Sequence, residues 1–291
     1  MNIKKYLAFV KTAELSSFTR AAKELGYTQS GISRMISDLE SELGVTLLDR
    51  SRAGVTLTSE GVELLPHMQR ICGENRSLMA HIQDIRGLER GLIRIGTFSS
   101  IATHWLPNMI QRFEREYPKI DFELQLGDYG EIEQWVSLGK VDFGFLPIYG
   151  RSELETRLVE RDRFLVILPV EHPLAGCERF PIKELESYPF MLLEKGGKTE
   201  ISAILDKYAV RPKIRFTTWD DYAIMSMVEH GLGISILPEL ILRRAPYKIV
   251  AKELEQPQFR ELGIAMRNYD TLPLAVKKFL EYLPYRWDGV T

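Results

Sequence analysis

The chain of 291 residues contains few cysteines and no cysteine motif. Its two thiols, Cys72 and Cys177, lie far apart, and neither belongs to a C-x-x-C pair or to a cluster with histidine. This spacing argues against a structural zinc site and against a disulfide framework. Glycine-rich phosphate-binding motifs are also missing from the contexts in which they act. We therefore expect the protein to need neither a metal nor a cofactor.

Long hydrophobic runs are missing as well. Nowhere do about 18 apolar residues follow one another, which is the length that a membrane-spanning helix needs. The N-terminal stretch MNIKKYLAFVKTAE has an apolar run that is too short for a secretory signal. These absences predict a cytoplasmic protein without a membrane partner.

The chain has no large excess of one sign of charge. It carries 38 Lys and Arg against 40 Asp and Glu, a formal net charge of -2. Any binding of nucleic acid must therefore come from a local patch. Residues 1–58 hold eight basic and six acidic side chains, which is a mild local excess of positive charge. The length allows roughly two domains of about 100–200 residues each.

The first part of the chain shows a pattern of short helices followed by a hairpin. Apolar residues at helical spacing predict a helix over residues 2–14 and a second helix that ends at Gly26. Thr28 is placed to cap a third helix that closes at Gly44. The segment VTLLDRSRAGVTLT then predicts a short two-stranded wing.

Two short helices at a tight turn, the second with a polar outer face, are typical of a helix-turn-helix. An α-helix fits the major groove of DNA, where Gln suits adenine and Arg suits guanine or a phosphate. Gln29 and Arg34 lie on the outer face of the third predicted helix, and Arg50 and Arg52 flank the wing. The pattern therefore favours double-stranded DNA as a partner.

Residues 59–86 predict one long helix with a heptad seam. The apolar positions follow one another in steps of 4, 3, 7, 4 and 3, and Asn75 fills the gap. Such a seam favours pairing with a second copy, and the alternative is a helix that packs on its own domain. The predicted dimerisation residues are Leu64, Met68, Ile71, Asn75, Leu78, Ile82 and Ile85.

From Leu92 onward, predicted strands and helices alternate. This alternation argues for an α/β fold with crossover helices, and about 200 residues suit two similar lobes. The strand LIRIGT ends at Thr97, directly before Phe98, Ser99 and Ser100, where a helix begins. Ligands bind at the carboxyl ends of strands in open α/β sheets, and a helix N-terminus favours an anion.

The N-terminal segment resembles the LysR-type transcriptional regulators. The resemblance rests on Phe9, SFTRAAKELGYTQSGISRMISDLESELG, LLDR and LTSEG, and it extends more weakly over the whole chain. Leu48 departs from the family pattern, which more often has an aromatic residue there. The resemblance implies an N-terminal winged helix-turn-helix (residues 1–58), a linker and dimerisation helix (59–88) and an effector-binding domain (89–291) similar to periplasmic binding proteins.

The same resemblance implies how the domains act. Lobe 1 of the effector domain is expected at about 91–161 and 267–291, and lobe 2 at about 162–266, with a ligand cleft between them. Homodimers are expected to pair through the linker helix and to assemble into homotetramers on an inverted-repeat promoter site, where RNA polymerase is a further partner. The predicted DNA-binding residues are Arg20, Thr28, Gln29, Ser30, Gly31, Ser33, Arg34, Arg50 and Arg52.

The effector is predicted to be a small organic molecule, with an anion favoured by the hydroxyls around the first strand end. In lobe 2, the stretches EKGGKTE and FTTWDD add polar groups ahead of two helices. Phe98 and Trp219 are candidates to enclose an apolar body. The predicted effector-binding residues are Thr97, Phe98, Ser99, Ser100, Ile148, Lys198, Thr199, Thr218 and Trp219.

Three other functions remain open at this point. An enzyme is the main rival, because His172 and Cys177 lie close in EHPLAGC, yet no residue to orient the histidine is evident. A redox-responsive regulator would need a cysteine pair in the effector domain, which contains Cys177 alone. A constitutive DNA-binding protein without an effector is the third. We expect a regulator of LysR type that is not an enzyme.

Overall fold

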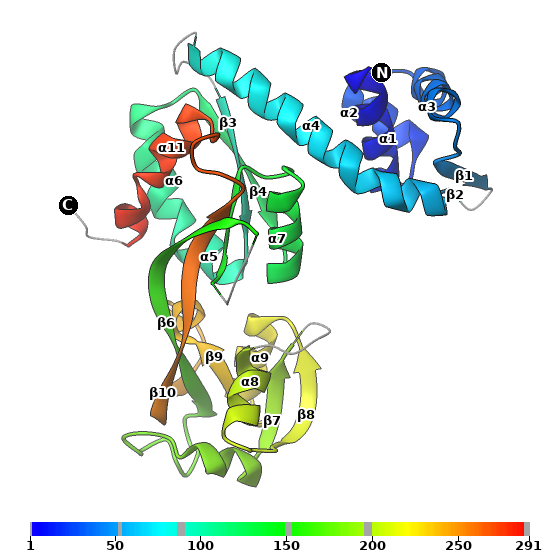
Figure 1. Ribbon diagram of the computed structural model, residues 1–291. Helices are drawn as coiled ribbons and strands as arrows, with labels where there is room; N and C mark the ends of the chain where they lie inside the picture. The colour runs from blue at the N-terminus through cyan, green and yellow to red at the C-terminus, as the bar shows by residue number, and fades with distance from the viewer. Residues whose placement is uncertain (1, 52–53, 86–90, 149–152, 195–199, 288–291) are drawn as a thin grey trace.

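The computed structural model describes residues 2–51, 54–85, 91–148, 153–194 and 200–287. Three helices and a hairpin form the N-terminal domain (Figure 1). They are α1 (Ile3–Leu15), α2 (Phe18–Leu25), α3 (Gln29–Leu43), β1 (Leu48–Ser51) and β2 (Gly54–Leu57). β1 and β2 pair in antiparallel fashion. This arrangement confirms the predicted helices and the predicted wing.

The core of the N-terminal domain comes from the apolar faces of its three helices. Phe9, Ile32, Ile36 and Leu39 are fully buried, and Leu48 is buried beside them. The burial of Leu48 explains why an aliphatic side chain is tolerated where the family pattern favours an aromatic one. The left-handed conformation of the glycines after α2 and α3 ends both helices, as the sequence predicted.

One long helix, α4 (Ser59–Ile85), leads from the N-terminal domain to the rest of the chain. Its start is fixed by Thr58, whose hydroxyl accepts a hydrogen bond from the Gly61 amide (2.9 Å) and donates to the Thr46 carbonyl (2.7 Å). A side chain at Gly61 would collide with the Leu47 carbonyl oxygen, 2.1 Å from an ideal Cβ. The wing and α4 are therefore packed closely.

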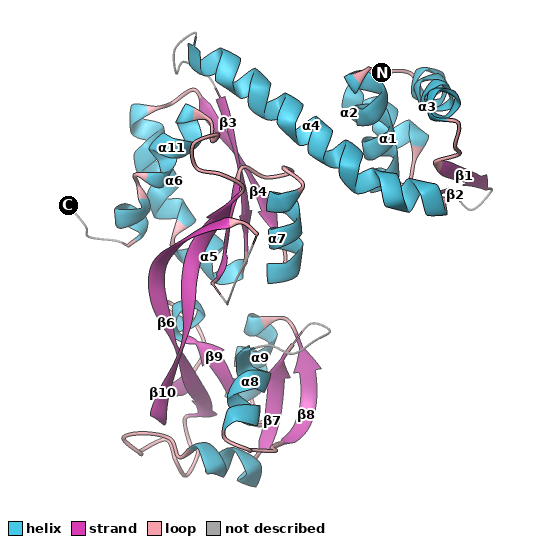
Figure 2. Cartoon of the chain, viewed as in Figure 1, coloured by secondary structure: helices cyan, strands magenta, loops and turns pink. Residues whose placement is uncertain are grey.

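A six-stranded sheet runs through both lobes of the C-terminal domain (Figure 2). Its strand order is β4-β3-β5-β10-β6-β9. β3 runs parallel to β4 and β5, whereas β10 is antiparallel to β5 and β6. The strands are β3 (Gly91–Thr97), β4 (Ile120–Leu126), β5 (Phe143–Pro147), β6 (Glu155–Pro169), β9 (Ser235–Pro238) and β10 (Ile249–Met266).

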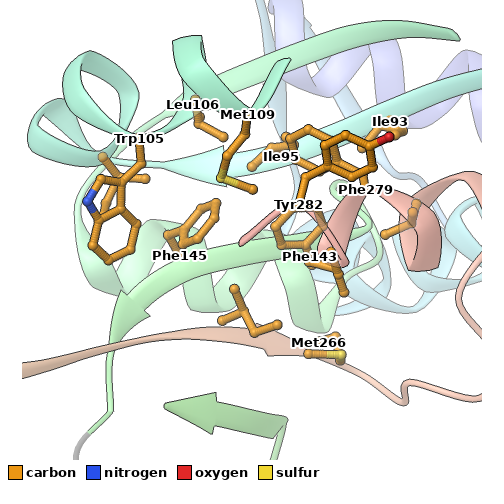
Figure 3. Close-up of a cluster of buried hydrophobic side chains, with 14 of the residues drawn as sticks. Ile93, Ile95, Trp105, Leu106, Met109, Phe143, Phe145, Met266, Phe279 and Tyr282 are labelled. Carbon is orange, nitrogen blue, oxygen red and sulfur yellow. The ribbon is translucent and has the colours of Figure 1, made fainter. Parts of the chain in front are cut away.

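Lobe 1 is built on the β4-β3-β5 side of this sheet. Its aromatic-rich core includes Trp105, Phe113, Phe143, Phe145 and Phe279, several of which Figure 3 shows packed together. The helices are α5 (Ser99–His104), α6 (Leu106–Glu116), α7 (Tyr129–Ser137) and α11 (Leu274–Leu280), with a 3₁₀ turn at Leu283–Arg286. The sequence predicted one helix where α5 and α6 stand, and Pro107 marks the start of the second.

Lobe 2 contains a small second sheet and two hydrophobic clusters. β7 (Pro189–Leu193) and β8 (Lys213–Thr218) pair in parallel. Around them lie a 3₁₀ helix (Ile182–Ser187), α8 (Glu200–Lys207), α9 (Asp221–Glu229) and α10 (Glu239–Leu242).

The lobes are joined by β6 and β10, which pass side by side from one lobe to the other (Figure 2). α10 is a third connection, because Leu240 belongs to the core of lobe 1 while Ile241 belongs to a core of lobe 2. The positions of the charged groups between the lobes are therefore fixed by the register of β6 and β10 and by the packing of α10.

Candidate functional site

The N-terminus of α3 presents polar groups to solvent. Thr28 caps the helix, because its hydroxyl accepts a hydrogen bond from the Gly31 amide (3.1 Å) and lies 3.2 Å from the Ser30 hydroxyl. Gln29, Ser30 and Arg34 are exposed, whereas the opposite face of α3 is buried. Within the described part of the chain, the side chains of Gln29 and Arg34 form no hydrogen bond or ion pair. Both are therefore available to an external partner.

Two of the predicted DNA-binding arginines are engaged inside the domain. Arg50 donates to the hydroxyls of Ser33 and Ser37, each at 3.0 Å, and its guanidinium lies 5.0 Å from the centre of the Phe18 ring. Arg20 donates to the Leu15 carbonyl oxygen. Arg50 therefore links the wing to α3, and the DNA contacts of Arg20, Ser33 and Arg50 stay predictions. Arg52 lies outside the described residues.

The predicted seam of α4 is divided between two surroundings. Met68 is buried against the core of its own N-terminal domain, which matches the alternative of a helix that packs on its own domain at this position. Ile71 and Leu78 are exposed at 44% and 58%, and Leu64, Asn75 and Ile82 are half-buried. The side chain of Ile85 is outside the described residues. An apolar strip around Ile71 and Leu78 thus faces solvent in the single chain.

The end of β3 places four predicted effector residues near the contact between the lobes. Thr97 and Ser100 are buried, Phe98 is nearly so, and Ser99 is half-buried. Phe98 precedes α5 without a side-chain cap, so the first amides of this short helix have no side-chain acceptor from that position. The Phe98 ring packs edge-on against Tyr129, with ring centroids 5.1 Å apart.

Arg260 lies at the centre of this region and was not predicted from the sequence. It is 4% exposed, and its register partner across the two connecting strands is Asp162. Its Nε and Nη2 donate to Asp162 Oδ2 at 2.9 and 2.7 Å, Nη1 donates to the Tyr129 hydroxyl at 2.8 Å, and Nη2 donates to the Ser100 hydroxyl at 3.1 Å. One buried cation thus ties both connecting strands to lobe 1.

Lobe 2 contributes acidic groups to the same region. Asp221, in the first turn of α9, is within electrostatic reach of Arg260, and so is Glu200 at the start of α8. Burial raises the pKa of Asp221 from its usual value near 3.8 to about 6, although Arg260 opposes the shift. Burial likewise raises the pKa of the Tyr129 hydroxyl, so it remains protonated. We call Ser100, Tyr129, Asp162, Asp221 and Arg260 the inter-lobe junction.

The remaining predicted effector residues take different positions. Ile148 is half-buried and packs over Gly263, where an ideal Cβ would lie 2.2 Å from its Cδ1. The Thr218 hydroxyl accepts a hydrogen bond from the Asp220 amide (3.3 Å), and Trp219 is 67% exposed. Among the described residues Phe98 packs against Tyr129 and not against Trp219, and the enclosure of an apolar ligand body by Phe98 and Trp219 stays a prediction. Lys198 and Thr199 lie outside the described residues.

The rival chemical readings find no support in the described side chains. His172 accepts a hydrogen bond at Nδ1 from the Leu174 amide (3.1 Å), and its buried Nε2 has no partner, so no bond to Cys177 is formed. Cys72 is buried on α4, where burial raises the pKa of its thiol to about 11, whereas Cys177 lies in lobe 2. The described residues contain no group of His, Cys, Asp and Glu arranged to hold a metal ion.

Two family models match the chain over the domains just described. Residues 3–62 match the bacterial regulatory helix-turn-helix proteins of the lysR family, and residues 86–288 match the LysR substrate-binding domain. The chain belongs to the LysR family. It is accordingly a DNA-binding transcriptional regulator with an effector-binding domain.

Relatives of this family match over nearly the whole length. The Bacillus subtilis HTH-type transcriptional regulator YvbU is 31% identical, with 97% of each chain covered. The probable HTH-type transcriptional regulator LrrA of Synechococcus elongatus is 34% identical, covering 97% of this chain and 96% of its own. The relatives are named as regulators, in keeping with the expectation that the protein is not an enzyme.

A solved structure of the same family shares the fold. Full-length CbnR in complex with its target DNA superposes with a TM-score of 0.70, at 21% identity, and covers 98% of this chain and all of its own. No helix within the described residues is both long and apolar enough to cross a membrane.

The comparisons assign the domains, whereas the roles of single residues rest on their positions. Arg260, Asp162 and Tyr129 were not predicted because they lie on three separate elements, whereas Asp221 ends the polar stretch FTTWDD but was not named as a site residue. The available clue to Arg260 was its position ahead of an apolar run, in FRELGIAM. The pairing of Arg260 with Asp162 needs the register of β6 and β10, which no local pattern supplies.

Proposed function

We propose that α3 reads base edges in the major groove through Gln29 and Arg34, with Thr28 and Ser30 contacting phosphate. The observation that carries this proposal is the unpaired, exposed state of Gln29 and Arg34 on a helix whose opposite face is fully buried. CbnR, which has the same fold, was solved with its target DNA. Arg50 links the wing to the reading helix at the surface through its hydrogen bonds to Ser33 and Ser37.

The protein acts as a homodimer paired through α4. Ile71 and Leu78 form an exposed apolar strip with Asn75 between them, and such a strip is stabilised by burial against a second copy. A two-fold dimer predicts an inverted-repeat operator, because each copy presents the same helix to one half-site. A charge introduced at Leu78 is expected to yield monomers in light scattering. A variant that remains dimeric would show that α4 does not form the dimer interface.

Two sheet edges offer a second contact between copies, as a homotetramer requires. β4 exposes Leu124 and Leu126 beside acidic side chains at positions 121 and 123. β8 exposes Ile214 and Phe216 beside basic side chains at positions 213 and 215. The two edges are complementary in charge and alike in apolar exposure, so β4 of one copy fits β8 of another.

A small organic effector binds at the inter-lobe junction. The supporting observation is that Arg260, a fully buried cation, joins lobe 1 to both connecting strands while two acidic groups of lobe 2 approach it. A ligand that contacts both sides is able to change the relative position of the lobes. That change shifts the population of domain arrangements, and with it the spacing of the two reading helices on DNA.

The charges at the junction restrict the chemistry of the effector. An anionic end is placed best against the uncapped first turn of α5, near Ser99 and Ser100, with Arg260 behind them. Arg260 is already neutralised by Asp162, and Asp221 adds negative charge on the other side. The end that faces Asp221 is therefore neutral or positively charged, as in an amino acid.

Calorimetry with three ligand panels tests this assignment. Amino acids and other zwitterions are expected to bind more tightly than dicarboxylates, and simple amines are expected to bind weakly. Ser100→Ala should weaken the binding of any ligand found and leave DNA affinity intact. Tight binding of dicarboxylates with no response to Ser100→Ala would place the effector elsewhere.

The protein works in the cytoplasm, and its bound form alters DNA bending and the contact with RNA polymerase at a promoter. It performs no catalysis, since His172 and Cys177 share no hydrogen bond and His172 Nδ1 accepts a hydrogen bond from the Leu174 amide. Turnover of an ester or peptide by the purified chain would overturn this part.

A further inference from the structure

Helix α7 touches both the inter-lobe junction and the linker helix. Its first residue, Tyr129, accepts the hydrogen bond from Arg260 Nη1 (2.8 Å). The turn after its last residue, at Gly139 and Lys140, contacts α4 and α1. Figure 1 shows α7 lying between α4 and lobe 2. Nine helical residues span roughly 13 Å, so one short helix bridges the two regions.

α7 is held as a rigid body on lobe 1. Asp128 and Glu131 form a capping box at its start, with hydrogen bonds of 2.8 and 2.9 Å. Ile132 is fully buried directly over two strand glycines. A Cβ at Gly144 would lie 2.5 Å from Ile132 Cγ2, and one at Gly96 would lie 3.1 Å from it. Because the helix moves as one body on the sheet, a displacement at its start is expected to appear at its end.

The far end of α7 meets α4 at a close approach of two glycines. An ideal Cβ at Gly73 would lie 3.0 Å from the Leu138 carbonyl oxygen and 3.1 Å from Gly139 Cα. Gly139 adopts a φ of +64°, which favours glycine. Arg76 of α4 donates from Nη2 to the Gly139 carbonyl oxygen at 2.6 Å.

Two ion pairs extend this contact. Lys140 lies 2.8 Å from Glu14 of α1, which links lobe 1 to the N-terminal domain itself. Arg267, at the end of the connecting strand β10, pairs with Glu74 of α4. We call the contacts of Gly73 and Arg76 with Gly139, of Glu74 with Arg267, and of Glu14 with Lys140, the linker dock.

The linker dock is poised to open. Arg76 has no carboxylate at ion-pair distance among the described residues, and burial lowers the pKa of its guanidinium. The Gly139 carbonyl oxygen accepts the hydrogen bond of this partly buried cation, while Asp142 and Glu14 attract it at longer range, so a displacement of Gly139 breaks that hydrogen bond. Gly73 lies two residues beyond Ile71, about 200° around the helix, so the contact of Gly73 with Gly139 and the proposed dimer strip occupy different faces of α4.

We propose that α7 couples the two sites: a change at the Arg260–Tyr129 contact shifts α7 and opens or closes the linker dock. The orientation of the N-terminal domain relative to lobe 1 then follows the state of the junction. This inference deepens the proposed effector response and rests on it for the natural trigger. The coupling itself is a property of the free chain, so it is measurable without effector or DNA.

Hydrogen exchange on the full-length protein tests the coupling. Tyr129→Phe removes the hydroxyl that accepts from Arg260 and keeps the ring. We expect exchange in α4 near residues 73–80 to become faster by about twofold or more, a change of the size found for coupled sites. Tyr208→Phe is the matched control, because it removes a hydroxyl that is bonded to Gln258 of β10 (2.7 Å) and not to Arg260.

A second variant distinguishes coupling through the linker dock from a general loss of stability. Gly73→Gln blocks the close approach to Gly139 and keeps α4 helical, since Gln is a better helix former than Gly. In this background Tyr129→Phe should add no further change in α4. Unchanged exchange in α4 for Tyr129→Phe, or the same increase for Tyr208→Phe, would overturn the coupling. Neither result bears on DNA reading by α3, so the two proposals fail separately.

Discussion

The reading face of α3 and the inter-lobe junction are both polar, yet they are built in opposite ways. On α3, the side chains of Gln29 and Arg34 are exposed and unpaired among the described residues, and one short segment supplies them. At the junction, Arg260 is buried and makes four hydrogen bonds to residues from three other elements. The reading face of α3 is available to a charged partner such as DNA. At the junction, Asp162 already neutralises Arg260, so a ligand has to change existing contacts in order to bind there.

The largest effect is expected at the junction. Arg260→Met leaves Asp162 buried without its partner, which should lower the free energy of unfolding by about 3–5 kcal/mol. Denaturant unfolding of the purified protein measures this loss. Arg161→Met is the control, because the pair of Arg161 with Glu261 is solvent-exposed and should change stability by about 1 kcal/mol or less. If both variants lost the same free energy of unfolding, the buried pair of Arg260 and the exposed pair of Arg161 would not differ as described.

Arg34→Ala should leave the fold intact and weaken specific DNA binding by about 1–3 kcal/mol, because an exposed base contact is lost. Arg50→Ala should instead lower the free energy of unfolding, since it removes two hydrogen bonds and the contact with Phe18. Anisotropy and thermal unfolding on both variants check this division. A destabilised Arg34→Ala protein, or an unaffected Arg50→Ala fold, would reverse the assigned roles.

The next effect is a pH dependence that comes from Asp221. Its pKa of about 6 in the folded chain exceeds the usual value near 3.8, so the folded state keeps a proton that the unfolded state has lost. Stability from this group therefore falls as pH rises from about 4 to 6. Asp221→Asn should be more stable than the parent by about 1–2 kcal/mol above pH 6, and equally stable near pH 4. If the difference in stability between Asp221→Asn and the parent were the same at all pH values, the raised pKa of Asp221 would be wrong.

The smallest effect is expected at the cap of the reading helix. Thr28→Ala removes the hydroxyl that accepts from the Gly31 amide, at a cost of about 1 kcal/mol. Thr28→Ser retains the cap and serves as the control. If Thr28→Ala unfolded at the same denaturant concentration as the parent, the cap would contribute nothing to α3.

The same contrast explains what the sequence revealed. The helix-turn-helix, the wing and the strand–helix alternation depend on caps, glycines and spacing within short segments, and the structure confirms them. Ser100, which accepts a hydrogen bond from Arg260, was predicted as an effector residue because it follows a strand end. Arg260 and Asp162 are 98 residues apart and meet through strand register, and the division of the α4 seam depends on which side of α4 the N-terminal domain covers. Both are long-range features that no local pattern carries.

Fluorescence anisotropy on DNA from immediately upstream of the protein's own gene tests the central claim most directly. The comparison is with scrambled DNA of equal length, at two salt concentrations, for the parent and for Arg34→Ala. The account predicts tight, sequence-selective binding by the parent and a loss of selectivity in Arg34→Ala. Equal binding of both DNAs by both proteins, disappearing at the higher salt, would contradict the assignment of α3 as the reading surface for that site.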